Sequence, residues 1–203
     1  MYLSVTTDPL PMPLLGAGCA SLNGLLYVFG GVTTGEVFIN VAHVYNPSAA
    51  AGSRWSGIPS MNTARGYLAG VPVNGKIYAV GGRDGVISNT NIVEAYDPAD
   101  NTWHMVNHMQ TARAAPGAYS IGKYLFVCGG GWSNYFKTCE VYDTNAGYSG
   151  VWKTVPAVML QGRRTFAYAN IGPVLYAIAG YNGSFLNTAE RWSYEMYLPM
   201  LRK

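Results

Sequence analysis

Residues 74–82 read Asn-Gly-Lys-Ile-Tyr-Ala-Val-Gly-Gly, and near copies of this stretch recur along the chain. Asn-Gly is the preferred pair for a two-residue type I′ hairpin turn. The alternating run after it is typical of a strand, and the Gly-Gly pair ends that strand where a side chain would obstruct the backbone. The stretch therefore predicts the middle of one repeated β unit.

The three copies have the same layout of turn, alternating run and terminal glycine. They are residues 23–31 (Asn-Gly-Leu-Leu-Tyr-Val-Phe-Gly-Gly), 122–130 (Gly-Lys-Tyr-Leu-Phe-Val-Cys-Gly-Gly) and 172–180 (Gly-Pro-Val-Leu-Tyr-Ala-Ile-Ala-Gly). Their last glycines, Gly31, Gly82, Gly130 and Gly180, are 51, 48 and 50 residues apart. The chain therefore contains four repeats with a period near fifty.

Other residue types keep the same register. An aromatic residue follows each glycine pair and a tryptophan follows three of these aromatics, at Tyr45, Tyr96, Tyr142, Trp192, Trp55, Trp103 and Trp152. An acid stands two residues before the aromatic at Glu94, Glu140 and Glu190, where the first repeat has His43. An arginine stands 17 residues before the last glycine at Arg65, Arg113 and Arg163, where the first repeat has Leu14.

This register resembles the kelch motif, whose repeats each build one four-stranded blade of a β-propeller. The resemblance covers essentially all of residues 14–194, although Ala179 and Trp192 depart from the pattern in the fourth copy. In the second repeat it implies strands at residues 66–73, 76–80, 92–96 and 102–106. We therefore expect an all-β protein of four kelch-type blades, with blades at about 14–60, 61–108, 109–158 and 159–203 plus 1–13 in one domain, 1–203.

The two ends of the chain suggest how the ring closes. The fourth repeat looks one strand short, whereas residues 2–7 form an alternating run at the register of an outer strand. We expect this N-terminal strand to complete the last blade, which would remove exposed sheet edges. Kelch propellers more usually have six or seven blades, so the alternative is a larger ring whose other blades are missing or come from another chain.

Composition is consistent with a folded domain and excludes few functions. The sequence is 49% hydrophobic with a net charge of +3, which is too weak to indicate nucleic acid. It shows no apolar run long enough for a membrane span and no signal peptide, so we expect a cytoplasmic protein. Cys19, Cys128 and Cys139 are interpreted as reduced core thiols, although Cys128 and Cys139 could instead lie side by side across the ladder.

Two sets of residues are candidates for binding at the top face, which we define by the loops after the glycine pairs (32–40, 83–91, 131–137 and 181–187). The strand order places Arg65, Arg113 and Arg163 on this face, where they either tether blades or pair with ligand carboxylates. The repeated acids are better interpreted as structural partners than as catalysts. The loops add irregular aromatics, which either cover the core or form a binding hot spot: Trp132, Tyr135, Phe136, Tyr181 and Phe185.

The resemblance implies a non-catalytic interaction module, like the propellers of kelch substrate adaptors, that binds an acidic or turn-forming peptide on the top face. Such adaptors usually carry a BTB or F-box region for a ubiquitin ligase, and this sequence shows none. The alternative is an enzyme acting on an acidic sugar, similar to the kelch sialic acid mutarotases. We expect no cofactor, no metal, no nucleic acid and no membrane, a protein partner, and either a monomer or a blade-sharing dimer.

Overall fold

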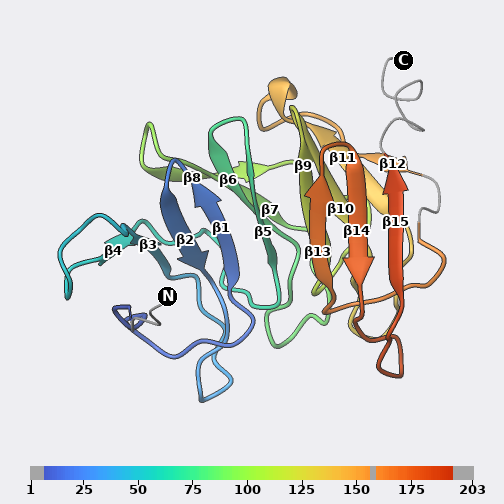
Figure 1. Cartoon of the computed structure of the whole chain (residues 1–203), viewed down its shortest axis with the longest axis horizontal. Coiled ribbons are helices and arrows are strands. Elements are labelled where there is room, and N and C mark those ends of the chain that lie inside the picture. Colours follow the sequence, from blue (N-terminus) through green and yellow to red (C-terminus); the bar gives the residue numbers. More distant parts are fainter. Residues whose placement is uncertain (1–6, 156–158, 194–203) are drawn as a thin grey trace, which may run out of the picture.

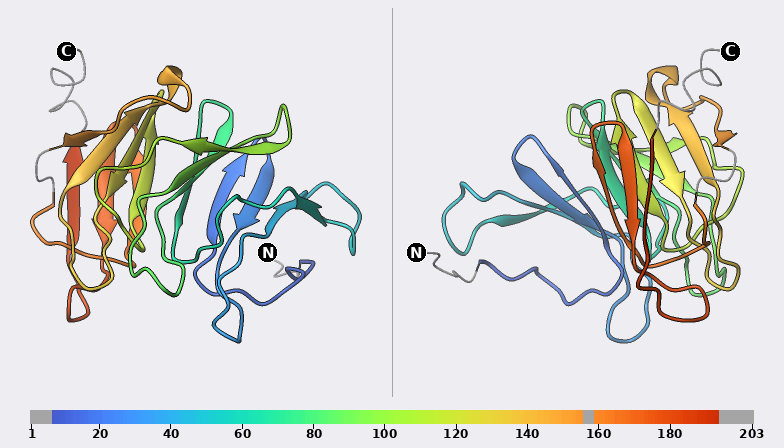
Figure 2. Two further views of the ribbon diagram at one scale, coloured as in Figure 1. Left: turned by 180° about the vertical axis from the view of Figure 1, so that it is seen from behind. Right: turned by 45° about the vertical axis from the view of Figure 1, so that its right-hand side comes forward.

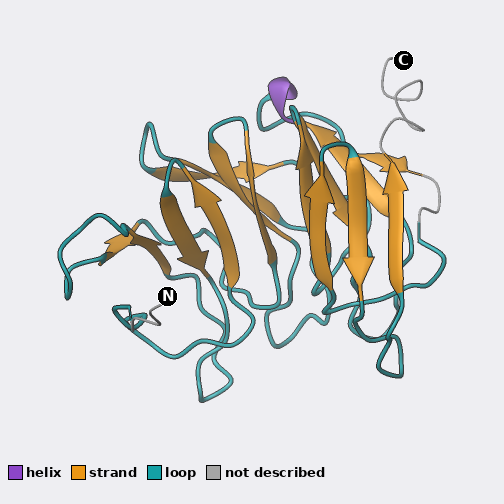
Figure 3. Ribbon diagram, in the orientation of Figure 1, coloured by secondary structure: helices purple, strands orange, loops and turns teal. Residues whose placement is uncertain are grey.

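The computed structural model describes residues 7–155 and 159–193 of the 203-residue chain. Its regular structure is almost entirely β-strand, with one short 3₁₀ helix in the described part, η1 (Thr144–Ala146) (Figure 3). The strands form four antiparallel sheets that follow one another along the chain (Figure 1). The molecule is therefore an all-β protein of four blades arranged as a β-propeller, as the repeats predict.

The first blade consists of β1 (Gly18–Leu22), β2 (Leu25–Phe29), β3 (Ala42–Tyr45) and β4 (Trp55–Ile58). The second consists of β5 (Ala69–Val73), β6 (Lys76–Val80), β7 (Val93–Asp97) and β8 (Thr102–Val106). The third consists of β9 (Gly117–Ile121), β10 (Tyr124–Cys128), β11 (Cys139–Asp143) and β12 (Lys153–Val155), and the fourth of β13 (Ala167–Ile171), β14 (Val174–Ile178) and β15 (Ala189–Ser193). Predicted and observed ranges coincide for β6 and β8.

The Asn-Gly pairs form the hairpin turns expected of them. Asn74 and Gly75 have φ angles of 48° and 72°, and the register places Val73 opposite Lys76. Positive φ at both central residues is what a type I′ turn requires, and Asn and Gly adopt it at little cost. Each such turn aligns an inner strand with its neighbour.

The glycine pairs are structural, and in the second repeat the closest neighbour of each glycine is backbone rather than an aromatic ring. A Cβ on Gly81 would collide with the carbonyl oxygen of Arg113, and one on Gly82 would lie 2.7 Å from the carbonyl oxygen of Gly66. Gly82 also donates its N–H to the Arg113 carbonyl at 2.8 Å. The pair is therefore required where the next blade's backbone crosses the end of the second strand.

Apolar cores lie between consecutive blades, whose inner strands β1, β5, β9 and β13 pack in succession. Each core joins the forward face of one blade, which we define as the face toward the next blade, to the rear face of the blade that follows. At the second junction, for example, Val80 packs with Leu125 and Trp152. Burying one such side chain contributes roughly 1.5–3 kcal/mol, so these junctions dominate the stability.

The predicted closure of the ring falls mainly on residues outside the described part. The first and fourth blades lie at opposite ends of an arc (Figures 1 and 2), and the fourth sheet has three strands in the described residues. Of the expected N-terminal strand only Thr7 is described, and its hydroxyl hydrogen-bonds Tyr45 in the first blade. Closure by residues 2–7 therefore remains a prediction.

The interpretation of all three cysteines as reduced thiols is wrong. Cys128 and Cys139 are paired residues of β10 and β11, and they form a disulfide with a Cα–Cα distance of 4.1 Å. Cys19 is free and exposed. The alternative interpretation, that Cys128 and Cys139 lie side by side across the ladder, is confirmed. Within the described residues no helix is long and apolar enough to cross a membrane.

Candidate functional site on the top face

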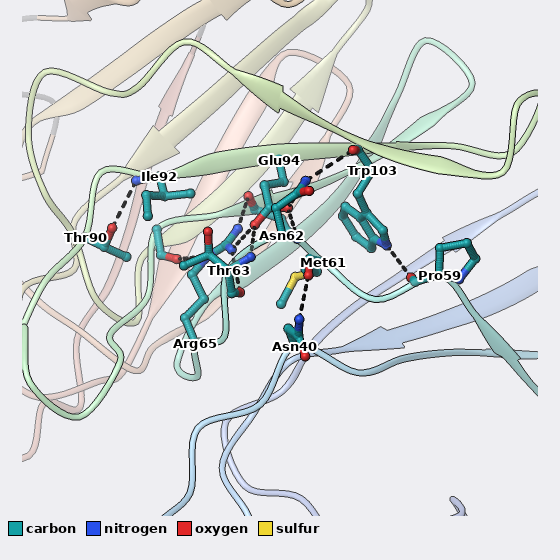
Figure 4. Close-up of polar contacts among 12 residues, drawn as sticks. Asn40, Pro59, Met61, Asn62, Thr63, Arg65, Thr90, Ile92, Glu94 and Trp103 are labelled. Carbon is teal, nitrogen blue, oxygen red and sulfur yellow. Dashed lines mark hydrogen bonds and ion pairs between the residues drawn. The ribbon is translucent and has the colours of Figure 1, made fainter.

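Arg65 and Glu94 form a buried ion pair that holds the entrance to the second blade (Figure 4). Both side chains are 0% exposed. Arg65 also donates to the carbonyl oxygens of Gly81 at 3.0 Å and Ala79 at 3.1 Å, while Glu94 accepts the backbone N–H groups of the incoming linker, including that of Thr63 at 3.2 Å. We call this arrangement the clasp. It joins the linker from one blade to the third strand of the next.

The clasp recurs in the third and fourth blades. Arg113 pairs with Glu140 at 3.3 Å, and Arg163 pairs with Glu190. Burial lowers the pKa of Arg65 and of Arg113, and the neighbouring glutamate opposes that effect in each case. An arginine in this environment needs its acidic partner to balance its charge, since an unpaired buried charge is costly.

The expectation that these three arginines bind a ligand is contradicted by their burial. The side chains of Arg65, Arg113 and Arg163 are all 0% exposed. Most of their donors serve a glutamate and backbone carbonyls of their own blade, and Arg113 and Arg163 also donate to a threonine hydroxyl. The Nε of Arg163 has no partner among the described residues. The alternative interpretation, that they tether blades, is the one the geometry supports.

The first blade lacks every part of the clasp. Leu14 replaces the arginine, His43 replaces the acid, and Pro11 stands where Asn62 donates its backbone N–H to Glu94. Proline has no such donor. The arginine, the glutamate and the backbone N–H donor are therefore absent together. None of the three is left buried without its partners.

A second pair of positions lies at the rim of the blades, and its residue types differ from one blade to the next. An isolated β-bridge joins the residue after the clasp position to the residue after the glycine pair, as Leu15↔Val32, Gly66↔Arg83 and Arg164↔Tyr181. The first of these bridges is apolar, whereas the second and the fourth blade each contribute one arginine. Arg83 and Arg164 are the functional candidates that the sequence reasoning missed. Their signal was the departure from the repeat, because a ligand site normally breaks symmetry.

Arg83 and Arg164 both lie against the ring of Trp132 from the third blade. Each guanidinium carbon is 4.3 Å from the ring centroid, a distance at which cation–π attraction operates. Arg164 is also 4.8 Å from the ring of Tyr181. The cluster therefore draws residues from three blades to one point on the top face. We call these four residues the Arg–Trp cluster.

The charges of the cluster are not neutralised within the described residues. The Nε of Arg83 and that of Arg164 are buried without a hydrogen-bond partner, and neither side chain forms an ion pair with a described acid. Asp84 is adjacent, but its carboxylate accepts backbone N–H groups of its own loop, at Val86 and Ile87. Arg163 also has a buried Nε without a partner, but its charge is paired with Glu190. A buried donor together with an unpaired charge therefore distinguishes Arg83 and Arg164 and marks the cluster for ligand binding.

Trp132 is held in place by Asn89 from the neighbouring blade. The Asn89 side-chain oxygen accepts the backbone N–H of Trp132 at 2.8 Å and that of Ala114 at 3.2 Å. Tyr67 packs on the same indole, with ring centroids 4.8 Å apart. The indole is thus held by two residues of the second blade before any ligand arrives.

A cleft of about 710 Å³ opens beside the cluster, between the first blade and the Trp132 ring. Arg83, Tyr67 and Trp132 form one wall, and Leu15 and Phe38 contribute apolar surface. Glu36 is the acid on its lining. The cleft therefore combines one unpaired cation with aromatic and aliphatic surface. Such a lining suits an acidic segment that also carries an apolar side chain.

The structure brings together some of the predicted aromatics and separates others. Tyr135 packs edge-on against Tyr181, and Tyr181 against Phe185, with ring centroids 5.8 and 5.6 Å apart. Phe185 is 92% exposed. Phe136 instead packs over the buried guanidinium of Arg113 at 5.3 Å, so it supports a clasp. Among the described residues, no group of three or more His, Cys, Asp or Glu is placed to hold a metal ion.

Four antiparallel blades in one arc, each entered through a clasp or its apolar substitute, define a β-propeller. A family model described as the Kelch motif matches residues 13–62 and 64–110. The chain belongs to the kelch-repeat β-propeller family, as the spacing of its motifs indicates.

Curated relatives support the assignment over part of their length. The chain is 37% identical to F-box protein AFR of Arabidopsis thaliana, over 71% of this chain and 37% of that protein. It is 32% identical to Kelch-like protein 41b of Danio rerio, over 71% of this chain and 22% of that protein. It is 36% identical to Kelch repeat and BTB domain-containing protein 13 of Homo sapiens, over 59% and 26%. The aligned region is thus well under half of each relative.

Proposed function

We propose that this chain is a non-catalytic protein-interaction module that binds an acidic segment of a partner protein on its top face. The observation that carries the proposal is the Arg–Trp cluster, in which two guanidinium groups without acidic partners among the described residues lie against one indole. Guanidinium groups pair with carboxylates in bidentate geometry, and Arg, Trp and Tyr are the residues most enriched in binding hot spots.

The names of the relatives are consistent with this role. They describe an F-box protein and a kelch repeat and BTB domain-containing protein. The kelch substrate adaptors that the sequence resembles use their propeller to bind a partner protein. An adaptor function and a cytoplasmic location remain part of the proposal. A disulfide such as Cys128–Cys139 is more typical of oxidising compartments, so the location needs its own measurement.

The rival is an enzyme acting on a small acidic sugar. A catalytic role for the repeated acids is disfavoured by their position, because Glu94 and Glu140 are buried in clasps. Glu36 is the acid that lines the cleft, so the lining offers one carboxylate to an enzyme mechanism. A small anion and an acidic peptide would both pair with Arg83, so the two functions must be separated by experiment.

Binding of a fluorescein-labelled hexaglutamate peptide, measured by anisotropy at low and at physiological salt, tests the proposal. We expect saturable binding that weakens as salt rises, and a loss of roughly tenfold to a hundredfold on Arg83→Ala or Arg164→Ala, the range for a charge-assisted hydrogen bond. Arg164→Lys should recover only part of the affinity, since lysine lacks the planar fork.

Lys153→Ala is the matched control, because Lys153 is exposed and lies on β12 away from the cluster. Equal losses in this variant would show that only net charge matters. A thermal-shift screen of anionic sugars provides the other arm. Saturable stabilisation by one sugar, together with no binding of the peptide, would favour the enzyme and reject the interaction module.

A further inference from the structure

The forward face of the fourth blade is apolar and exposed, although its counterparts are core. Ile178 is 47% exposed, whereas Phe29, Val80 and Cys128 at the same position of the other blades are all 0% exposed. Ile171, on the same face, is 71% exposed. In the first three blades this face is covered by the rear face of the blade that follows.

The rear face of the first blade shows the complementary exposure. Leu26 is 38% exposed, whereas its counterparts Ile77, Leu125 and Leu175 are no more than 1% exposed. Tyr45 and Trp55 pack against each other on this face, where other blades bury the equivalent aromatics. The arc thus ends in two different surfaces, the rear face of the first blade and the forward face of the fourth. Within the chain, a face of the first kind always packs on a face of the second kind.

Backbone hydrogen bonds repeat at every junction and extend this complementarity. One series runs along the rim, from Tyr67 N–H to the Gly16 carbonyl at 2.6 Å, from Ala115 to Tyr67 at 2.7 Å, and from Thr165 to Ala115 at 3.1 Å. The other runs from the second glycine of each pair to the next blade, as Gly31 to Arg65, Gly82 to Arg113 and Gly130 to Arg163, at 2.8–2.9 Å.

Both series stop at the ends of the arc, where they leave a matched set of groups. The first blade retains the Gly16 N–H and the Leu14 carbonyl, and the fourth retains the Thr165 carbonyl and the Gly180 N–H. None of these four groups has a hydrogen-bond partner among the described residues. One further junction of the same kind would satisfy all four.

The approach to the first blade is already arranged for such a junction. Trp55 donates its indole N–H to the carbonyl of Asp8 at 3.0 Å. Trp103 and Trp152 make the same bond to Pro59 and Asn107, each of which directly follows the outer strand of the preceding blade. Asp8 therefore lies where the end of a preceding blade's outer strand lies.

We propose that a second copy of this chain docks head to tail, with the forward face of its fourth blade on the rear face of the first blade. Gly16 N–H then donates to the partner copy's rim, and the glycine N–H of that copy donates to the Leu14 carbonyl. The contact joins two different surfaces, so it is heterologous and closes into a ring when the rotation allows. It repeats the three junctions within the chain, which is why a second copy is the occupant.

Light scattering after size exclusion, over a range of protein concentrations, tests the proposal. We expect a parent mass of at least twice that of one chain. Ile178→Arg and Leu26→Arg each place a charge in the proposed contact, so each variant alone should run as a monomer. Val151→Arg is the control, because Val151 is 72% exposed and lies before β12, away from both faces.

Mixing the two variants separates head-to-tail docking from other contacts. Ile178→Arg keeps an intact first blade and Leu26→Arg keeps an intact fourth blade, so an equimolar mixture should form a dimer through one junction. Circular dichroism of each variant checks that it is folded. A monomeric parent protein overturns the proposal, and a ring closed within one chain would give that result. A mixture of folded variants that stays monomeric overturns it as well.

Discussion

Arg65 and Glu94 are both completely buried, and each is the counter-ion of the other. A third group completes the arrangement, since the linker backbone donates to the same carboxylate through Asn62 and Thr63. The ion pair thus fixes the path of the chain between two blades. This relationship explains why the acid and the arginine recur with the period of the blades rather than once at a single site.

Arg65→Leu should lower the free energy of unfolding by about 3–5 kcal/mol, because it leaves the Glu94 carboxylate buried without a cation. The double variant Arg65→Leu/Glu94→Gln should lose less than the sum of the two single changes, since neither charge then remains alone. Urea unfolding of the four proteins measures the coupling.

Arg54→Leu is the matched control for this cycle. Arg54 pairs with Asp8 at 3.5 Å near the surface, and such pairs contribute about 0–1 kcal/mol. If Arg65→Leu instead left the unfolding midpoint unchanged and abolished hexaglutamate binding, the arginine would be a ligand residue after all.

Asn89→Ala should weaken hexaglutamate binding without removing any charge. The change leaves the backbone N–H groups of Trp132 and Ala114 without their acceptor, and each unsatisfied group costs about 1–3 kcal/mol when buried. Trp132 would then no longer be held against the two guanidinium groups. Asn89→Asp retains the acceptor and should keep the loop in place, so thermal melting should rank it above Asn89→Ala. Equal midpoints for the two variants would contradict this role.

The Cys128–Cys139 disulfide closes the base of the loop that carries Trp132. Its sequence separation is 11 residues, and closing a loop of this size stabilises a protein by about 2–3 kcal/mol. Reduction should therefore lower the melting temperature and weaken peptide binding together. The double variant Cys128→Ala/Cys139→Ala should melt at the same temperature with and without reductant. A parent protein indifferent to reductant would show that the bond does not form in solution.

Asp8 should make the attachment of the N-terminal segment sensitive to acid. Backbone N–H groups of Gly52 and Arg54 hydrogen-bond its carboxylate and hold its pKa below the ordinary value of 3.8. Since the folded pKa is the lower one, the stabilisation is complete above pH 3.8 and is lost as the pH falls through the folded value. Asp8→Asn should abolish this dependence, which hydrogen exchange at Gly52 and Arg54 can follow. If the parent and Asp8→Asn showed equal exchange rates at these two amides at every pH below 3.8, the acid-sensitive role of Asp8 would be excluded.

The sequence by itself determined the strands and their order. The Asn-Gly turns, the alternating runs and the glycine pairs act over a few residues, so their meaning does not depend on distant parts of the chain. Repetition at a period near fifty then specified four similar blades. For the same reason β6 and β8 were predicted at their observed bounds.

Only the tertiary structure decided which residues of the top face are accessible. Arg65 and Arg83 both lie near the ends of strands, yet one guanidinium is buried in a clasp and the other packs on Trp132. The difference depends on contacts between blades, which residue spacing does not encode. The disulfide depends on pairing within one blade instead, because the two sulfurs meet only once β10 and β11 are in register. Packing between distant repeats, rather than local preference, therefore sets the chemistry of this surface.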